Sequence, residues 1–148
     1  MPTADTQDYR SSFTTKIPPQ ETFSKIDNVS KWWSTHFEGM SSKPGDVFTV
    51  RFSGGDWYTI RIEEMIPDKK IVWNVLDADQ TWHEDRDEWA GTQIVWEISA
   101  EENGSMVTMT HLGLVPAFEC YDQCKLGWDY LIQQSLYKYL TEGAGLPV

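Results

Sequence analysis

The sequence predicts an α+β fold, in which a curved antiparallel sheet of six to seven strands, two short helices and one long C-terminal helix enclose a cavity. Runs of alternating apolar and polar residues follow one another with short turns between them, which is typical of an antiparallel meander. A long amphipathic segment comes last, and it is the one predicted element large enough to cover the apolar face of the sheet. The 148 residues fit one domain over 1–148, of which residues 1–8 are polar and expected to be frayed.

The first predicted elements are a strand and two short helices. Alternation of side-chain character predicts a strand over Tyr9–Ile17. A proline pair ends this strand and opens a helix over Pro19–Asp27, because proline at the first helical position loses no hydrogen bond that the helix needs. Val29–Ser34 is expected to form a second helical turn, which carries two adjacent tryptophans.

Five strands in succession form the rest of the predicted sheet. A glycine pair, Gly54-Gly55, marks a hairpin turn between the first two. The third is apolar on both faces apart from Asn74, so we expect it to be covered on both sides. The five strands are Val47–Ser53, Trp57–Ile66, Lys70–Leu76, Gln93–Ala100 and Met106–Leu112.

An acidic segment, Asp77–Gly91, separates the third and fourth of these strands. Its carboxylates are dense enough to supply the oxygen ligands of a calcium site. Their spacing, however, does not match the Asp-x-Asp-x-Asp-Gly pattern of a calcium loop. A solvated loop is therefore favoured, and no metal is predicted. The segment contains Trp82 and Trp89, which either fold over the cavity mouth, so that residues 77–88 act as a lid, or only anchor the loop.

The C-terminal helix is predicted to begin after Pro116 and to run to about Glu142, where Gly143 provides a left-handed stop. A straight helix across a strongly twisted sheet leaves space between the two layers. Eight tryptophans exceed the usual needs of packing, and their large apolar rings suit the walls of such a space. The stripe predicted to face the sheet consists of Cys120, Cys124, Trp128, Leu131, Ser135 and Tyr139.

The charge balance limits the expected partners. Lys and Arg number 12 against 23 Asp and Glu, and the formal net charge of −11 repels phosphate backbones and anionic lipid heads. We therefore expect neither nucleic acid nor a membrane as a partner. With no signal peptide and no long apolar run, the sequence favours a soluble, cytoplasmic protein. Two cysteines without a secretory signal point to a reducing compartment.

A set of short motifs, spread over nearly the whole chain, carries a resemblance to a known family. They are Trp32-Trp33, Gly45-Asp46, Lys70-Ile71-Val72-Trp73, Glu88-Trp89-Ala90-Gly91-Thr92, Thr110-His111-Leu112-Gly113-Leu114, Cys120-Tyr121-Asp122-x-Cys124-x-x-Gly127-Trp128 and Gly143-Ala144-Gly145. The chain resembles the SRPBCC superfamily of START-like, helix-grip proteins, in the branch similar to the C-terminal domain of the activator of the heat-shock-protein-90 ATPase. The resemblance implies a helix-grip fold with an internal apolar cavity, and a chaperone as a possible partner. It implies no particular reaction, because members of the superfamily range from lipid carriers to cyclases.

Strand parity and the helix stripe together assign side chains to the cavity wall. Aromatic rings supply most of this predicted wall, with one histidine and one cysteine among them. The predicted ligand-binding residues are Trp32, Trp33, Phe48, Phe52, Tyr58, Trp73, Trp96, Met109, His111, Cys124 and Trp128.

His111 is the histidine that strand parity turns inward, so it is either a general base or, as we favour, a hydrogen-bonded core residue. Cys120 and Cys124 lie one helical turn apart, where a disulfide inside a helix is strained, and we interpret them as two small apolar side chains. A zinc site that includes His111 is disfavoured, because the three ligands lack the usual paired-cysteine spacing. The sequence predicts no cofactor, and no catalytic residue unless His111 serves an enzyme.

The leading hypothesis is binding of a small, largely apolar molecule in the cavity between the sheet and the C-terminal helix. One alternative is a cyclase- or dehydratase-type enzyme that uses the same cavity with His111 as its base, and it requires His111 to be exposed there. The other alternative is a protein-interaction domain similar to the chaperone activator, acting through its acidic surface.

Overall fold

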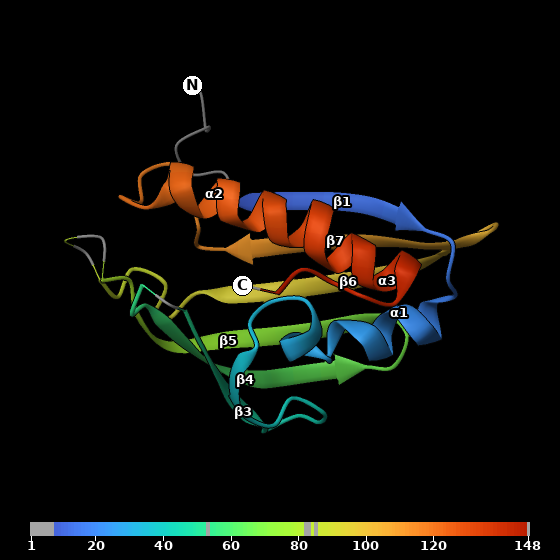
Figure 1. Ribbon diagram of the computed structural model, residues 1–148, viewed down its shortest axis with the longest axis horizontal. Coiled ribbons are helices and arrows are strands. Elements are labelled where there is room, and N and C mark those ends of the chain that lie inside the picture. The colour runs from blue at the N-terminus through green and yellow to red at the C-terminus, as the bar shows by residue number, and fades with distance from the viewer. Residues whose placement is uncertain (1–7, 53, 82–83, 85, 148) are drawn as a thin grey trace.

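Figure 1 shows a seven-stranded antiparallel sheet with helices on one of its faces, in a computed structural model. The structure describes residues 8–52, 54–81, 84 and 86–147. Neighbouring strands follow the order β1-β7-β6-β5-β4-β3-β2, so β2 to β7 form a meander and β1 pairs with β7. The predicted α+β, helix-grip arrangement is confirmed. The strands are β1 (Tyr9–Thr15), β2 (His36–Gly39), β3 (Val47–Arg51), β4 (Trp57–Ile66), β5 (Lys70–Asp79), β6 (Gln93–Glu101) and β7 (Gly104–Leu112).

The helices lie across the same face of the sheet in Figure 1. α1 (Pro19–Ile26) and the 3₁₀ helix η2 (Val29–Lys31) follow β1. The C-terminal helix, drawn in orange to red, is continuous through α2 (Tyr121–Tyr130), the π-helical η3 (Leu131–Leu136) and α3 (Tyr137–Glu142). It runs along the strands and forms the long side of the cover.

The predicted stripe of the C-terminal helix is confirmed, because all six of its residues are buried. The helix begins at Tyr121 rather than directly after Pro116, and Cys120 is its N-cap. Its end agrees with the prediction, since Gly143 adopts a left-handed φ of 82° and its N–H donates to the carbonyl of Tyr139.

One strand is additional, and several strand ends differ from the sequence prediction: β1 and β3 end two residues earlier, β6 ends one residue later and β7 begins two residues earlier. The sequence does not predict β2, because this strand has four residues, only one of which, Phe37, is partly buried. β2 forms by pairing with β3, which places Phe37 opposite Val50. β5 continues to Asp79, because Asp77 and Asp79 pair with the start of β4, so the acidic loop begins later than predicted.

Tryptophan rings fill much of the space between the sheet and its helical cover. Trp32 and Trp33, which follow η2, stack on Trp73 of β5 with ring centroids 6.5 and 5.9 Å away. Trp96 of β6 stands edge-on to Trp32 and Trp73, at 5.5 Å from each. These four side chains are at most 1% exposed. The indole N–H groups of Trp73 and Trp96 have no hydrogen-bond acceptor among the described residues.

Asp27, directly after α1, carries a partly buried carboxylate whose Oδ1 has no hydrogen-bond partner among the described residues. Burial raises the pKa of Asp27 to about 7, and the charge of Asp46 adds to the shift. Between its ordinary pKa of 3.8 and about 7, the folded protein therefore holds a proton that the unfolded chain has released. The free energy of unfolding falls as the pH rises through this window.

Replacing Asp27 by Asn is expected to remove this pH dependence. The difference in free energy of unfolding between Asp27→Asn and the wild type should grow in favour of the variant by about 1 kcal/mol from about pH 5.5 to about pH 8. This figure is reduced from the full pKa shift because the carboxylate is partly in contact with water. Urea denaturation at both pH values measures the two free energies of unfolding. An advantage that stays constant with pH would show that Asp27 ionises normally in the folded protein.

Candidate functional site

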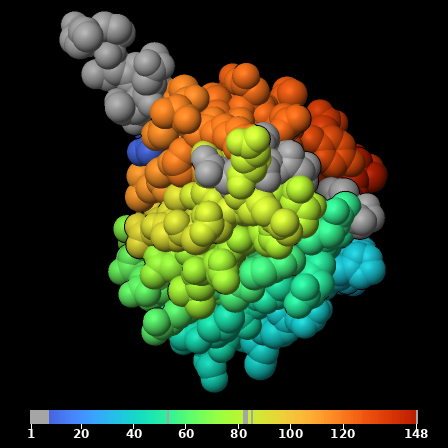
Figure 2. Space-filling model, turned by 90° about the vertical axis from the view of Figure 1, so that its left-hand side faces the viewer, coloured from blue at the N-terminus to red at the C-terminus, as the bar shows by residue number. Residues whose placement is uncertain are grey.

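A pocket of about 510 Å³ lies between the first turns of the C-terminal helix and the strands β3 and β4, and we call it the aromatic pocket. α2 forms one wall, while the end of β3, the start of β4 and the segment before β6 form the other. Figure 2 looks onto the end of the molecule at which these elements meet, with α2 in orange, the segment before β6 in yellow-green and the strands in green. The lining residues are Trp33, Phe52, Asp56, Tyr58, Trp89, Gln123, Cys124, Leu126, Gly127, Trp128, Tyr130 and Leu131.

The lining, rather than the volume, distinguishes this pocket. Other surface pockets reach about 630 Å³, but they lie at turns and strand ends. The pocket beside Tyr137 and the turn Glu101–Gly104 contains that one aromatic residue among mainly polar ones. A pocket lined by several aromatic rings and a few polar groups is the usual composition of a small-molecule site.

Four aromatic rings of the aromatic pocket contact one another in a closed ring. Between centroids, Tyr58 of β4 lies 4.4 Å from Trp89, and Trp89 stacks on Trp128 of α2 at 5.7 Å. Trp33 completes the ring at 5.3 Å from Trp128 and 6.2 Å from Tyr58. Each of the four side chains is at most 5% exposed. Because packing already holds these rings, a ligand that contacts them orders few side chains on binding.

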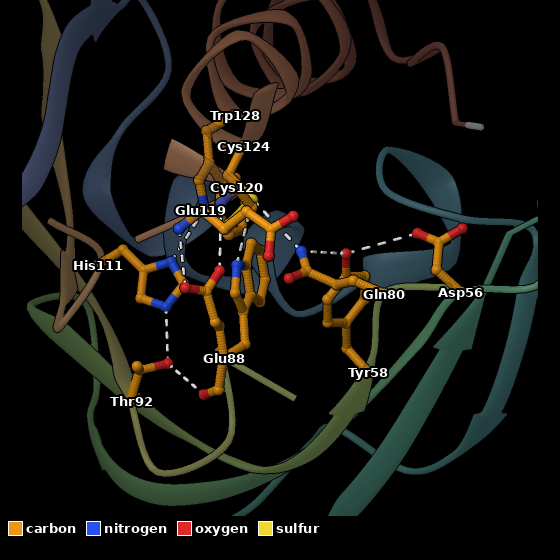
Figure 3. The surroundings of a disulfide bond; sticks show 11 residues. Asp56, Tyr58, Gln80, Glu88, Thr92, His111, Glu119, Cys120, Cys124 and Trp128 are labelled. Atoms are coloured by element: carbon orange, nitrogen blue, oxygen red, sulfur yellow. Dashed lines mark hydrogen bonds between the residues drawn. A yellow bond between two sulfur atoms is a disulfide. The ribbon is translucent and has the colours of Figure 1, made fainter. Parts of the chain in front are cut away.

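His111 lies behind the pocket wall, fully buried, with both ring nitrogens hydrogen-bonded (Figure 3). The indole Nε1–H of Trp128 donates to Nδ1 at 3.1 Å, so Nδ1 is unprotonated and Nε2 carries the hydrogen. Nε2–H therefore donates to Thr92 Oγ1 at 2.8 Å, and Thr92 donates to the carbonyl of Trp89 at 2.6 Å. Burial lowers the pKa of His111 to about 3.

These contacts favour the structural interpretation of His111 over the catalytic one. A general base needs a lone pair within reach of the substrate, whereas the lone pair on Nδ1 is taken by Trp128. The hydrogen bonds instead fix the positions of Trp128 and Trp89, which are two walls of the aromatic pocket.

Cys120 and Cys124 form a disulfide, so the interpretation as two unpaired apolar side chains is wrong. Cys120 precedes α2 as its N-cap, and the bond therefore spans the start of the helix instead of joining two positions inside it. Figure 3 shows the surroundings of the bond: Cys124 Sγ accepts N–H groups from Gln80 Nε2 and Trp89 Nε1, both at 3.3 Å. The disulfide joins the N-cap of α2 to its first turn, and the two hydrogen bonds attach that turn to Gln80 and to Trp89.

Gln80 is a polar residue of this site that sequence reasoning missed. It follows β5, its side chain is fully buried, and its Nε2 also donates to the hydroxyl of Tyr58 at 3.0 Å. Its Oε1 has no hydrogen-bond partner among the described residues. Gln80 stands within a run of acidic residues that reads as a solvated loop, and no pattern in that run signals burial. A backbone bond from its N–H to the carbonyl of Arg86, at 2.6 Å, holds the segment inward.

The acidic segment is anchored at its C-terminal end. The carboxylate of Glu88 accepts the backbone N–H groups of Glu119 at 2.8 Å and Cys120 at 3.2 Å, which caps the start of the C-terminal helix. Arg86 donates two hydrogen bonds to Asp79, at 2.6 and 2.8 Å. Trp82 lies outside the described residues, so a lid formed by residues 77–88 stays a prediction.

The structure separates the eleven predicted ligand-binding residues into two groups. One group lines the aromatic pocket, and its members are Trp33, Phe52, Tyr58, Cys124 and Trp128. The other group is enclosed in the core with at most 1% exposure, and its members are Trp32, Phe48, Trp73, Trp96, Met109 and His111. Strand parity and the helix stripe select inward-facing residues, but neither distinguishes a filled core from a pocket wall.

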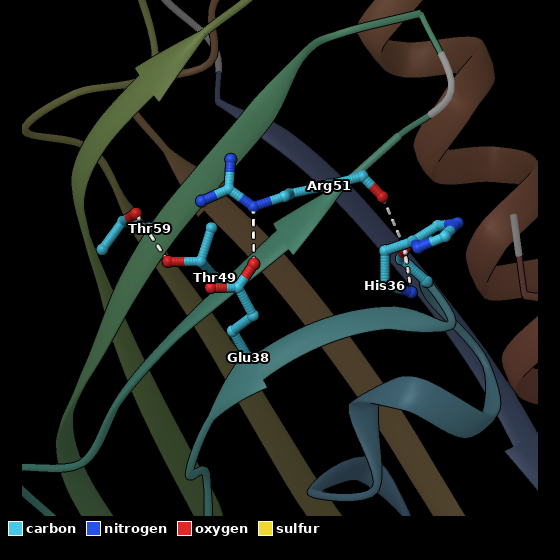
Figure 4. Close-up of polar contacts among 6 residues, drawn as sticks. His36, Glu38, Thr49, Arg51 and Thr59 are labelled. Carbon is cyan, nitrogen blue, oxygen red and sulfur yellow. Dashed lines mark hydrogen bonds and ion pairs between the residues drawn. The ribbon is translucent and has the colours of Figure 1, made fainter.

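His36 lies on the edge strand β2 and does not line the aromatic pocket (Figure 4). Its backbone N–H donates to Ser34 Oγ at 3.1 Å, and Ser34 donates to the carbonyl of Arg51 at 2.7 Å. Arg51 also pairs with Glu38 across the two strands at 2.7 Å. These contacts attach the short strand β2 to the sheet.

The described part of the chain contains no candidate metal site and no candidate membrane-spanning helix. No group of three or more His, Cys, Asp or Glu among the described residues is placed to hold a metal ion. No described helix combines the length and the apolar character that crossing a membrane requires.

Comparison with known proteins places the chain in a family. The sequence profile of the family described as "Activator of Hsp90 ATPase homolog 1-like protein" matches residues 21–141. The chain belongs to this family. The resemblance seen in the sequence motifs is thereby confirmed, and the match includes the elements that line the aromatic pocket. A search of curated proteins finds no match.

Solved structures share the family fold at low sequence identity. The solution structure of the Aha1 dimer from Colwellia psychrerythraea matches with a TM-score of 0.76 and 22% identity, covering 94% of this chain and 99% of that one. Protein MLL2253 from Mesorhizobium loti matches with a TM-score of 0.72 and 14% identity, covering 95% of this chain and 100% of that one. DynU16, a putative protein of the dynemicin biosynthetic locus, matches with a TM-score of 0.68 and 18% identity. That match covers 93% of this chain and 48% of DynU16, about half of its length. These similarities establish the fold alone.

Proposed function

We propose that the protein binds a small, largely apolar molecule in the aromatic pocket. The observation that carries this proposal is the closed ring of Trp33, Tyr58, Trp89 and Trp128 beside a pocket of about 510 Å³. A volume of this size suits a small organic molecule. The proposed site occupies one end of the space under the C-terminal helix, because buried tryptophan rings fill the remainder of that space.

The energetics of the pocket support binding of moderate affinity. A ligand that buries about 200 Å² of apolar surface gains roughly 5 kcal/mol before the cost of association. Leu126 and Tyr130 stand at the rim with 68% and 44% of their surfaces exposed, so a ligand would also cover apolar side chains that now face water. Ring packing and the disulfide hold the site in place before the ligand arrives, which lowers the cost of ordering.

The binding proposal ranks above the two alternatives for reasons of geometry. An enzyme of the cyclase or dehydratase type would need a base other than His111, whose ring nitrogens are both hydrogen-bonded behind the wall. The family description names a chaperone ATPase, and a net charge of −11 suits a basic partner protein. That charge is spread over the sequence, whereas the aromatic pocket is a defined site, and the proposal rests on the defined site.

Gly127 provides a direct test, because it lines the pocket and a Cβ added there meets no atom within 4 Å. Gly127→Leu is expected to fill the pocket and weaken binding of the uncharged dye N-phenyl-1-naphthylamine by at least about tenfold. Gly127→Ala serves as the matched control, since it adds one methyl group and should weaken binding far less. Both variants should be more stable than the wild type by about 0.5–1 kcal/mol, because glycine is a poor helix former.

Dye fluorescence reports binding, and urea denaturation reports stability for the same three proteins. A dye that binds the wild type and Gly127→Leu equally well would place the site elsewhere. The absence of dye binding to the wild type would remove the support for an apolar site of this size.

A further inference from the structure

The aromatic pocket carries an unequal distribution of charge. Among its described lining residues Asp56 is the one charged side chain, and the others are apolar, aromatic or uncharged. The whole chain has a formal net charge of −11, which adds to the negative potential at any surface opening. An anionic ligand would therefore meet repulsion at the site, and a cationic one would meet attraction.

The carboxylate of Asp56 is available to a ligand. Asp56 stands in the turn between β3 and β4, where its backbone carbonyl accepts the N–H of Phe52 at 3.0 Å and fixes the turn. Its carboxylate receives one long hydrogen bond, from the hydroxyl of Tyr58 at 3.4 Å, and makes no ion pair with any described residue. Because few donors neutralise its negative charge, this carboxylate beside the aromatic wall can still pair with a positively charged group of a ligand.

The aromatic rings offer π faces and few hydrogen-bond donors. The indole N–H groups of Trp89 and Trp128 are directed at Cys124 Sγ and His111 Nδ1, both inside the protein. The hydroxyl of Tyr58 donates to Asp56 and accepts from Gln80. The donors of these buried rings are therefore used inside the protein. The aromatic lining that remains more exposed is Phe52 and Tyr130, and the faces of such rings carry the negative end of the quadrupole, which attracts cations.

We propose that the aromatic pocket selects apolar molecules that carry a positive charge, such as an alkyl or aryl ammonium, with the cation between the aromatic faces and Asp56. This inference rests on the proposed function, because it names the chemical class that the same pocket accepts. Aromatic faces and a carboxylate attract the ammonium together, and the apolar part of the molecule occupies the remaining lining.

Three matched ligands test this selectivity by calorimetric titration. Benzyltrimethylammonium carries the cation, neopentylbenzene replaces its nitrogen by carbon, and 2,2-dimethyl-3-phenylpropanoate carries an anion on a similar frame. The cation is expected to bind about tenfold more tightly than the uncharged isostere, and the anion more weakly than either. In Asp56→Asn, the preference for the cation should shrink severalfold, because the amide keeps the acceptor for Tyr58 and loses the charge.

Asp122→Asn is the control for net charge. Asp122 lies on α2 and is absent from the pocket lining, so this variant changes the total charge by the same amount and should keep the cation preference. Equal binding of the cation and the uncharged isostere to the wild type would overturn the inference and leave the proposed function standing. Failure of all three ligands to bind would overturn both. An equal loss of preference in the two variants would assign it to overall charge and contradict a role for Asp56.

Discussion

Replacing Trp128 by alanine is expected to lower the free energy of unfolding by about 4 kcal/mol. Trp128 is 1% exposed, stacks on Trp89 and stands edge-on to Trp96 at 6.4 Å. Its removal leaves a cavity beneath α2 and takes the hydrogen-bond donor from His111 Nδ1, which then becomes a buried acceptor without a partner. The stability of a typical domain is about 5–15 kcal/mol, so the loss is a large part of the total.

Trp128→Phe separates the ring from its N–H group. Phenylalanine keeps much of the aromatic packing but donates no hydrogen bond, so this variant is expected to lose about 1–3 kcal/mol. Urea denaturation of the wild type and both variants, at a pH above the range in which histidine titrates, gives the comparison. A loss below about 1.5 kcal/mol for Trp128→Ala would show that the site collapses to fill the space, and that Trp128 is not a principal support of the pocket wall.

Acid is expected to destabilise the protein through His111. The folded protein keeps His111 neutral, with its pKa lowered to about 3, whereas the unfolded chain takes up a proton near pH 6.5. Between these values the unfolded state binds more protons, so the free energy of unfolding falls by up to about 1.4 kcal/mol for each pH unit of acidification below about 6.5. Above that pH, His111 contributes no further change.

Nitrogen-15 spectra of the imidazole ring, recorded across the same pH range, test the cause directly. The ring of His111 should keep its Nε2–H tautomer down to about pH 5, where denaturation already shows the loss of stability. Asp27 acts in the opposite direction over an overlapping pH range, so the two effects partly cancel in the wild type. Asp27→Asn removes this offset and shows the loss of stability through His111 alone. If the ring of His111 becomes protonated near pH 6.5 in the folded protein, the hydrogen-bonded assignment is wrong.

Period-two alternation predicts most of the sheet because one face is buried, and that face dictates apolar side chains at every second position. The stripe on the C-terminal helix follows from the same cause at helical spacing. β2 is not predicted, because its four residues are too few to show an alternating pattern. Hydrogen bonds to β3 hold it in the sheet even though its own sequence carries no strand signal. The boundaries of β5 depend on the register with β4 in the same way.

The candidate site is less predictable than the fold, since it depends on contacts between segments far apart in the chain. Gln80 and Cys124 are 44 residues apart, and neither sequence neighbourhood indicates that the two side chains meet. Trp73 and Trp33 both point inward and stack on each other, yet Trp33 lines the pocket and Trp73 lies in the core. The direction of a side chain follows from its own strand or helix, whereas access of a ligand to that side chain depends on how all the elements pack together.

The indole N–H resonances of a nitrogen-15-labelled sample test the central claim most directly. Each tryptophan gives its own signal, so titration with benzyltrimethylammonium shows which rings a ligand reaches. The signals of Trp33, Trp89 and Trp128 should shift on binding, while those of Trp73 and Trp96, enclosed behind them, should stay nearly unchanged. Shifts confined to Trp73 and Trp96 would place the ligand under the middle of the helix and contradict a binding site at its start.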